Sequence, residues 1–181
     1  MKKFELTAES KINIFGKKLF RIKALISFGD VEEGETGGWI EKEENLEQSS
    51  GDAWVYGDAE VYGNARVYGN AEVSGNARVY GNARVSGNAW VYGDARVSGN
   101  AEVYGNADYT TIHGFGTQFR TTTFFQCEDK QIRVSCGCFL GTIPEFREQV
   151  KNTREGKIAE EYLMIADLME KHFVKEKESG E

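Results

Sequence analysis

A six-residue repeat fills the middle of the chain and limits the folds open to it. From Gly51 to Thr110 the sequence reads GDAWVY GDAEVY GNARVY GNAEVS GNARVY GNARVS GNAWVY GDARVS GNAEVY GNADYT, which is ten hexads without an insertion. An α-helix cannot keep such a repeat on one face, because its 3.6 residues per turn do not divide six evenly. Six is a multiple of the two-residue period of a strand, so the repeat predicts short β-strands.

The positions within each hexad predict how these strands close into coils. Ala53 and Val55 lie two residues apart and share one face of a strand, as do their equivalents in later hexads. Glycine followed by Asn or Asp tolerates a positive φ and predicts a corner after each strand. Three hexads, or 18 residues, would then close one coil of a triangular parallel β-solenoid with Val and Ala inside. The repeat predicts a little over three coils.

Outward-facing residues 18 positions apart should stack about 4.8 Å from one another. This stacking predicts two charge pairs on the coils, Glu60 over Arg78 and Arg84 over Glu102. It also places both tryptophans of the repeat on one face. Solvated side-chain ladders are one interpretation of that face, and an interface is the other, because aromatic residues gather at interfaces. The candidate interface residues are Trp54, Tyr56, Trp90 and Tyr92.

Residues 1–50 are expected to form a β-rich N-terminal cap. Alternating apolar residues predict two strands joined by a turn at Phe15-Gly16-Lys17-Lys18. Residues 1–28 carry seven Lys or Arg and residues 30–47 carry eight acids, so we expect the two segments to pair. Gly37-Gly38-Trp39-Ile40 is predicted to belong to an irregular cover over the first coil, because a solenoid end exposes core and unpaired edge.

After the repeat, which we assign to residues 51–112, residues 113–181 are expected to form a C-terminal α+β cap. Two strands are predicted at 121–127 and 131–136. Thr142-Ile143-Pro144-Glu145 has the pattern of a capping box and predicts a short helix. A longer amphipathic helix is predicted over 155–173, followed by a frayed tail, KEKESGE.

The pattern Val-x-Gly-(Asn/Asp)-Ala-x resembles the hexapeptide repeat of left-handed parallel β-helices. The flanking segments RIKALISFGDVEEGETGGWIEKEENL, VSCGCFLGTIPEF and AEEYLMIADLMEKHF resemble a group of hexapeptide-repeat proteins common in phages and prophages of Gram-positive bacteria. The resemblance implies a mainly β protein with a left-handed coil and a mobile-element source. Enzymes of this fold pack flat faces around a threefold axis, which implies a homotrimer. The same fold hosts acyltransferases, carbonic anhydrases and scaffolds, so it does not fix the function.

Composition excludes several functional classes. The net charge of −7 argues against a general nucleic-acid binder, whose affinity depends on neutralising phosphates. No stretch approaches the roughly 18 apolar residues of a membrane span. The start, MKKFELTAES, lacks the apolar segment of a secretory signal, so the three cysteines are expected to be reduced thiols in a cytoplasmic protein.

Histidines and cysteines offer little catalytic chemistry. Acyltransferases of this fold use a histidine near a subunit boundary, whereas the repeats here contain none, and His113 lies just beyond them. No catalytic residue is assigned. Cys127, Cys136 and Cys138 could nominally join His113 in a zinc set. The thiols of Cys136 and Cys138 are expected to point in different directions whereas zinc needs converging ligands, so neither a metal nor another cofactor is predicted.

The segment GFGTQFRTTT, directly after His113, is the most suggestive for binding. Its glycines expose backbone N–H groups, Arg120 brings a fork of donors, and the threonines add hydroxyls that could hold a phosphate or carboxylate. The alternative is a plain strand in which Arg120 meets an acid of the C-terminal helices. The candidate ligand-binding residues are His113, Phe115, Arg120 and Thr122.

We therefore expect a non-enzymatic binding protein on a trimeric β-helix scaffold. Its expected role is that of a phage counter-defence or host-takeover factor that sequesters a host protein or a small, anionic, nucleotide-like ligand. An acyltransferase and a purely structural scaffold are the alternatives. No membrane or nucleic-acid partner is predicted.

Overall fold

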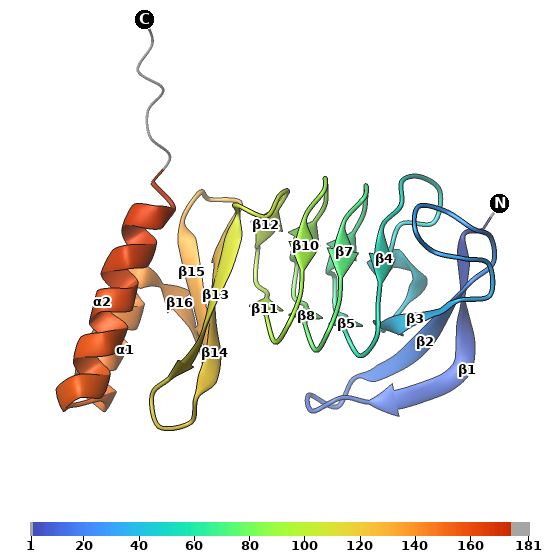
Figure 1. Ribbon diagram of the computed structural model, residues 1–181. Helices are drawn as coiled ribbons and strands as arrows, with labels where there is room; N and C mark the ends of the chain where they lie inside the picture. Colours follow the sequence, from blue (N-terminus) through green and yellow to red (C-terminus); the bar gives the residue numbers. More distant parts are fainter. Residues whose placement is uncertain (1, 175–181) are drawn as a thin grey trace, which may run out of the picture.

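The computed structural model describes residues 2–174 and shows a parallel β-solenoid between two different end units (Figure 1). An N-terminal hairpin lies at one end, and a small sheet covered by two helices lies at the other. The tail predicted to fray, residues 175–181, lies outside the described residues. No described helix combines the length and apolar character needed to cross a bilayer.

The solenoid consists of two-residue strands at six-residue spacing. They are β4 (Trp54–Val55), β5 (Glu60–Val61), β6 (Arg66–Val67), β7 (Glu72–Val73), β8 (Arg78–Val79), β9 (Arg84–Val85), β10 (Trp90–Val91), β11 (Arg96–Val97) and β12 (Glu102–Val103). Each strand from β4 to β9 pairs in parallel with the strand three places further along, as β4 does with β7. The result is three faces, one of them β4-β7-β10, which confirms the predicted coil of three hexads.

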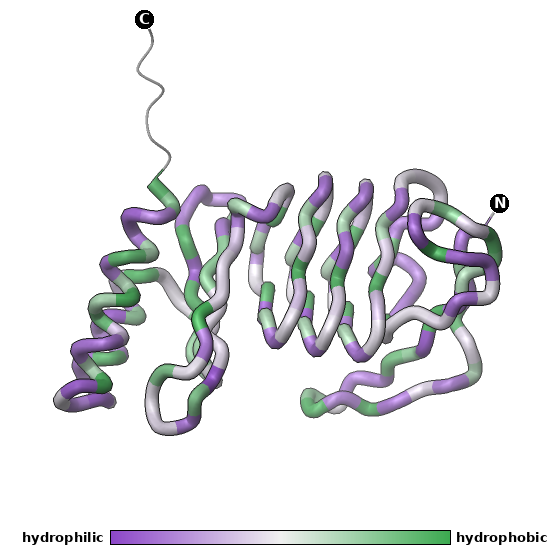
Figure 2. Tube along the Cα trace, viewed as in Figure 1, coloured by the Kyte–Doolittle hydropathy of each residue, from purple (hydrophilic) through white to green (hydrophobic). Residues whose placement is uncertain are grey.

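The interior of the coils is as predicted. Every repeat Val from Val55 to Val103, and every Ala two residues before it, is at most 1% exposed. The corner glycines from Gly51 to Gly99 all have φ between 60° and 73°. The predicted charge pairs also form, with Glu60–Arg78 at 3.6 Å and Arg84–Glu102 at 3.4 Å. Figure 2 shows apolar and polar residues alternating along the coils.

The tenth hexad leaves the solenoid, contrary to prediction. Its glycine, Gly105, lacks the positive φ of the other corners, and Asp108 accepts hydrogen bonds from the backbone N–H groups of Tyr104 and Gly105. The chain then enters β13 (Tyr109–Phe115), which pairs antiparallel with a later strand. The expected boundary between residues 112 and 113 therefore falls inside a single strand.

The N-terminal hairpin is as predicted, with β1 (Phe4–Ile12) antiparallel to β2 (Lys18–Ala24). The expectation of an irregular cover is wrong for the segment that follows. β3 (Thr36–Ile40) pairs in parallel with β5, so the β5-β8-β11 face gains a fourth rung. Gly37 and Gly38 replace the side chains that a strand usually alternates, because the backbone of β3 lies directly against the core. A Cβ added at Gly38 would be 2.6 Å from Val55 Cγ1.

A short 3₁₀ turn, η1 (Glu43–Asn45), follows β3, and the acidic segment around it meets the basic hairpin. Lys2 bonds Glu43 at 2.7 Å and Lys17 bonds Glu41 at 3.1 Å. The predicted pairing of the two oppositely charged segments is confirmed.

The C-terminal unit is an antiparallel sheet of β13, β14 (Arg120–Gln126), β15 (Ile132–Cys136) and β16 (Phe139–Thr142). Helices α1 (Ile143–Thr153) and α2 (Gly156–His172) cover its outer face (Figure 1). The predicted capping box forms, because Thr142 Oγ1 accepts from the Glu145 N–H and Glu145 accepts from the Thr142 N–H. β13 and β16 were not predicted.

Candidate functional site

Strand alternation in β14 divides the predicted ligand residues between two faces of the C-terminal sheet. Thr123 faces the solenoid, where its hydroxyl accepts a hydrogen bond from the Arg96 N–H at 3.0 Å. Arg120 and Thr122 lie on the opposite face, toward the helices. His113 contacts Thr121 at 3.1 Å on the solenoid-facing side. His113 and Arg120 are therefore not brought together.

A β-bulge returns Phe115 to the helix side. Ile112 pairs with Thr122 and Phe115 with Arg120, so β13 has one residue more than β14 between these pairs. The Phe115 ring packs on the core of the C-terminal unit. Thr122 is 2% exposed and donates its hydroxyl hydrogen to Cys136 Sγ at 3.2 Å, so the structure uses this hydroxyl internally.

The polar groups on the helix side converge on a cavity of about 100 Å³, which we call the Arg120 cleft. It lies between one end of the sheet and the two helices. The groups that matter for binding are the side chains of Thr117, Arg120, Cys136, Cys138, Arg154 and Tyr162. Arg120 is thus the one predicted ligand residue that is both exposed and part of a cavity.

Two glycines make room for the polar groups of the Arg120 cleft. A Cβ added at Gly116 would lie 2.6 Å from the Tyr162 hydroxyl, and one added at Gly137 would lie 2.6 Å from Arg120 Nη1. Both glycines also have positive φ, +72° and +62°, which other residues rarely adopt. The Tyr162 hydroxyl uses this space to donate to the Phe115 carbonyl at 3.2 Å.

The charged side chains that line the Arg120 cleft are both positive. In the described part of the chain, no carboxylate lies within salt-bridge distance of Arg120 or Arg154. Burial and the adjacent Cys136 raise the pKa of Tyr162, while Arg154 and Arg120 act in the opposite direction. The alternative expectation, that Arg120 pairs with an acid of the helices, is wrong for the described residues. Asp167 and Glu170 of α2 instead form salt bridges with Arg147, at 2.7 Å and 2.6 Å.

Sequence reasoning missed Arg154 and Tyr162 as parts of this site. Arg154 follows the last residue of α1, where a basic side chain is ordinarily explained by the helix dipole. Tyr162 lies within the predicted amphipathic helix, where a tyrosine is ordinarily explained by packing of the apolar face. The signal that could have found Tyr162 is Gly116, because the absence of a Cβ there leaves space for the Tyr162 hydroxyl.

Cys136 and Cys138 lie on either side of the turn between β15 and β16. Both residues line the Arg120 cleft, because Gly137 forms a tight turn between β15 and β16. Among the described residues, no group of three or more His, Cys, Asp or Glu is placed to hold a metal ion.

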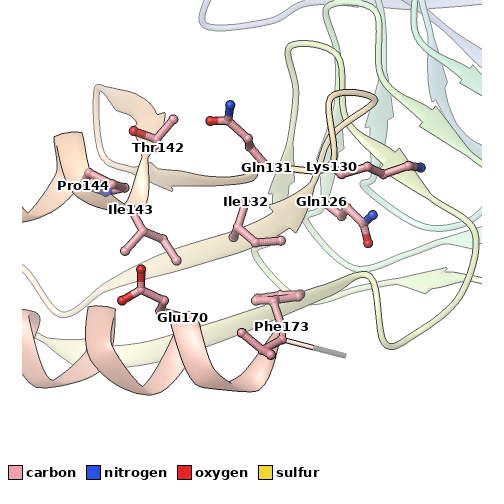
Figure 3. Close-up of a pocket in the computed structure, with 10 residues that line it drawn as sticks. Gln126, Lys130, Gln131, Ile132, Thr142, Ile143, Pro144, Glu170 and Phe173 are labelled. Carbon is pink, nitrogen blue, oxygen red and sulfur yellow. The ribbon is translucent and has the colours of Figure 1, made fainter. Parts of the chain in front are cut away.

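A larger groove of about 530 Å³ lies where β14 and β15 meet the helix ends (Figure 3). Its floor is apolar, from Ile132, Ile143 and Phe173. Its charged groups are engaged elsewhere: Lys130 points away from this floor in Figure 3 and lies 3.7 Å from Glu102, and Glu170 bonds Arg147. Although Gln126, Gln131 and Thr142 add polar groups, neither charged lining residue is without a partner in the described part of the chain.

The predicted aromatic interface is divided as well. Trp54 is fully buried, packed edge-on against Phe4 and Phe28, so it offers no surface to a partner. Tyr56 is partly buried against the same core. Trp90 and Tyr92 are 47% and 53% exposed, with ring centroids 4.9 Å apart. We call these two residues the Trp90 patch.

The fold defines the chain as a parallel β-solenoid protein, and comparison with known families agrees. Residues 59–75, 71–87 and 77–93 are each similar to the YdcK beta solenoid repeat. These matches lie entirely within the coils, so they describe the repeat and not the end units. No curated protein matches the chain.

Proposed function

We propose that this chain is a non-enzymatic binding protein that holds a small anion in the Arg120 cleft, on a left-handed solenoid scaffold. One observation carries the proposal: Arg120 and Arg154 lie in one cavity with the Tyr162 hydroxyl and have no carboxylate partner among the described residues. Neither guanidinium has a described carboxylate within salt-bridge distance, although the chain carries 29 Asp and Glu.

The chemistry of the Arg120 cleft suits a phosphate or a carboxylate. Guanidinium groups present planar forks of donors, and charge-assisted hydrogen bonds are stronger than neutral ones. The Tyr162 hydroxyl adds a polar group, although its hydrogen is directed at the Phe115 carbonyl. A cavity of about 100 Å³ accommodates the anionic group of a nucleotide-like ligand but not the whole molecule.

The wider role rests on the resemblance to phage and prophage proteins described above. We propose a counter-defence or host-takeover factor that acts in the host cytoplasm by sequestering its ligand. The Trp90 patch is the proposed contact with further copies of the chain in a homotrimer or with a host protein. Its aromatic character supports this assignment.

Isothermal titration with inorganic phosphate and with adenosine diphosphate tests the binding proposal. Arg120→Ala and Arg154→Ala are each expected to weaken binding by roughly 10- to 150-fold, which corresponds to losing about 1.5–3 kcal/mol. Arg66→Ala is the matched control, because Arg66 is exposed on a coil away from the cleft. Equal affinity in the wild type and both cleft variants would overturn the proposal.

A further inference from the structure

We propose that Cys136 and Cys138 form a redox-active dithiol whose closure to a disulfide weakens anion binding in the Arg120 cleft. The regulatory half of this inference rests on the proposed function. The formation of the disulfide does not, and it is tested separately.

The placement of the two thiols carries the inference. Cys136 is the last residue of β15, Cys138 immediately precedes β16, and both line the Arg120 cleft. Gly137 between them has φ +62°, which turns the chain back tightly. Cys138 is exposed and Cys136 is partly exposed, so an oxidant from solution can reach the pair.

The third cysteine differs in every respect that governs reactivity. Cys127 is 3% exposed and belongs to the core of the solenoid. Burial raises the pKa of its thiol to about 11. Because the thiolate is the reactive form, Cys127 is inert at neutral pH and serves as an internal reference.

The oxidant is a peroxide. The Cys138 thiol loses its proton to solvent and the thiolate attacks one peroxide oxygen. The O–O bond breaks, a sulfenic acid forms, and the departing hydroxide takes up a proton from solvent to give one water. The Cys136 sulfur then attacks the sulfenic sulfur. The S–S bond forms as the S–O bond breaks, and the hydroxide leaves with the Cys136 proton as the second water. Two thiols and one hydrogen peroxide thus give one disulfide and two waters, with the two electrons passing from sulfur to oxygen.

Closure would act on the Arg120 cleft through two contacts. Arg120 Nη1 lies against the turn, only 2.6 Å from where a Cβ on Gly137 would be. Thr122, two residues along β14, donates to Cys136 Sγ. Bringing the two sulfurs to bonding distance moves the turn and removes this acceptor, so the guanidinium loses its present position. We expect phosphate affinity to fall about tenfold on oxidation, equivalent to about 1.4 kcal/mol.

Thiol counting and intact mass spectrometry test the disulfide. In the native protein we expect two thiols to react rapidly with Ellman's reagent and the third only after unfolding. Mild peroxide should lower the mass by about two units through loss of two hydrogens, and a dithiothreitol wash should restore it. Cys127→Ser should behave as wild type, whereas Cys136→Ser and Cys138→Ser should lose the effect. A peroxide-treated protein that forms only sulfinic acid or intermolecular dimers would overturn the dithiol.

Phosphate titration of the reduced and oxidised forms tests the switch. A tenfold loss of affinity that dithiothreitol reverses, and that Cys138→Ser abolishes, supports it. Equal affinity in the two forms overturns the switch while leaving the disulfide established. If the reduced protein binds no phosphate, the proposed function and the switch both fail, and the thiol count still decides whether the dithiol exists.

Discussion

The two ends of the solenoid are closed by opposite means. At the N-terminal end, β3 joins the solenoid's own β5-β8-β11 face, and Phe4 and Ile22 of the hairpin share one core with the coils. At the C-terminal end, an antiparallel sheet meets the last coil and keeps a separate core between itself and the helices, built around Phe124, Phe146 and Tyr162.

This difference separates the residues that stabilise the coils from those of the proposed binding site. The N-terminal unit has little freedom to vary, because most of its buried apolar residues belong to the same core as the first coils. The C-terminal unit commits one face to the solenoid, with Phe125 reaching into the solenoid core, and keeps its other face for the helices. The Arg120 cleft lies on that second side, where polar groups can be unpaired without opening the coils.

The largest expected effect tests whether the N-terminal unit is part of the solenoid core. Trp54→Ala should lower the free energy of unfolding by about 3–5 kcal/mol, because the ring is fully buried between Phe4 and Phe28 and its loss leaves a cavity. Urea titration followed by circular dichroism measures this. A loss below about 1 kcal/mol would mean that the hairpin does not seal the first coil.

A smaller effect distinguishes coil corners from the exit out of the solenoid. Gly81→Ala should cost about 1–3 kcal/mol, because Gly81 has φ +73° and an added Cβ would lie 2.9 Å from the Gly99 backbone nitrogen. Gly105→Ala is the matched control, since Gly105 has no positive φ and nothing within 4 Å of an added Cβ. Equal urea midpoints for the two variants would contradict the assignment of Gly105 to the exit.

The sequence predicted the coils well because there local and global preferences coincide. Val, Ala, Gly and the charge pairs each follow from the two-residue strand period and the 18-residue coil. β3 escaped prediction because Ile40 pairs with Val61, 21 positions further on, and because Gly37 and Gly38 do not show strand alternation. β3 is a strand of the solenoid that does not carry the hexad repeat, and patterns within a single strand do not reveal such a strand.

The candidate site was half predictable for a similar reason. Arg120 was found because its neighbours are glycines and threonines in a short segment. Arg154 and Tyr162 come from the helices, more than 30 positions away, and only tertiary packing brings them to it. Trp54 and Trp90 occupy equivalent repeat positions, so no periodicity could tell that the hairpin buries one and leaves the other exposed.

The stability of the C-terminal unit should depend modestly on pH and should fall only in acid. Hydrogen bonds from the Thr142 N–H and hydroxyl hold the pKa of Glu145 below its usual value of 4.5. Because the folded pKa is depressed, this contribution to stability is fully present above pH 4.5 and is lost as the pH falls through the folded value. The stability advantage of the wild type over Glu145→Gln should therefore shrink in acid. In urea titrations, an advantage that stays constant as the pH falls would contradict this assignment.

The smallest expected effect on stability belongs to the Trp90 patch. A substitution there is expected to change how the protein associates with other chains. Trp90→Ala removes a half-exposed ring, whose Nε1 donates to Ser74 Oγ at 2.9 Å, and should change the free energy of unfolding by less than about 1 kcal/mol. Light scattering decides its role: a wild-type mass of about three times 20.3 kDa that falls to 20.3 kDa in the variant assigns the patch to a trimer. A trimer that persists while capture of a bacterial host protein fails assigns it to recognition. A wild-type protein of 20.3 kDa would refute the trimer directly, and because Trp54 is sealed by the hairpin, no second tryptophan of the repeat could take its place.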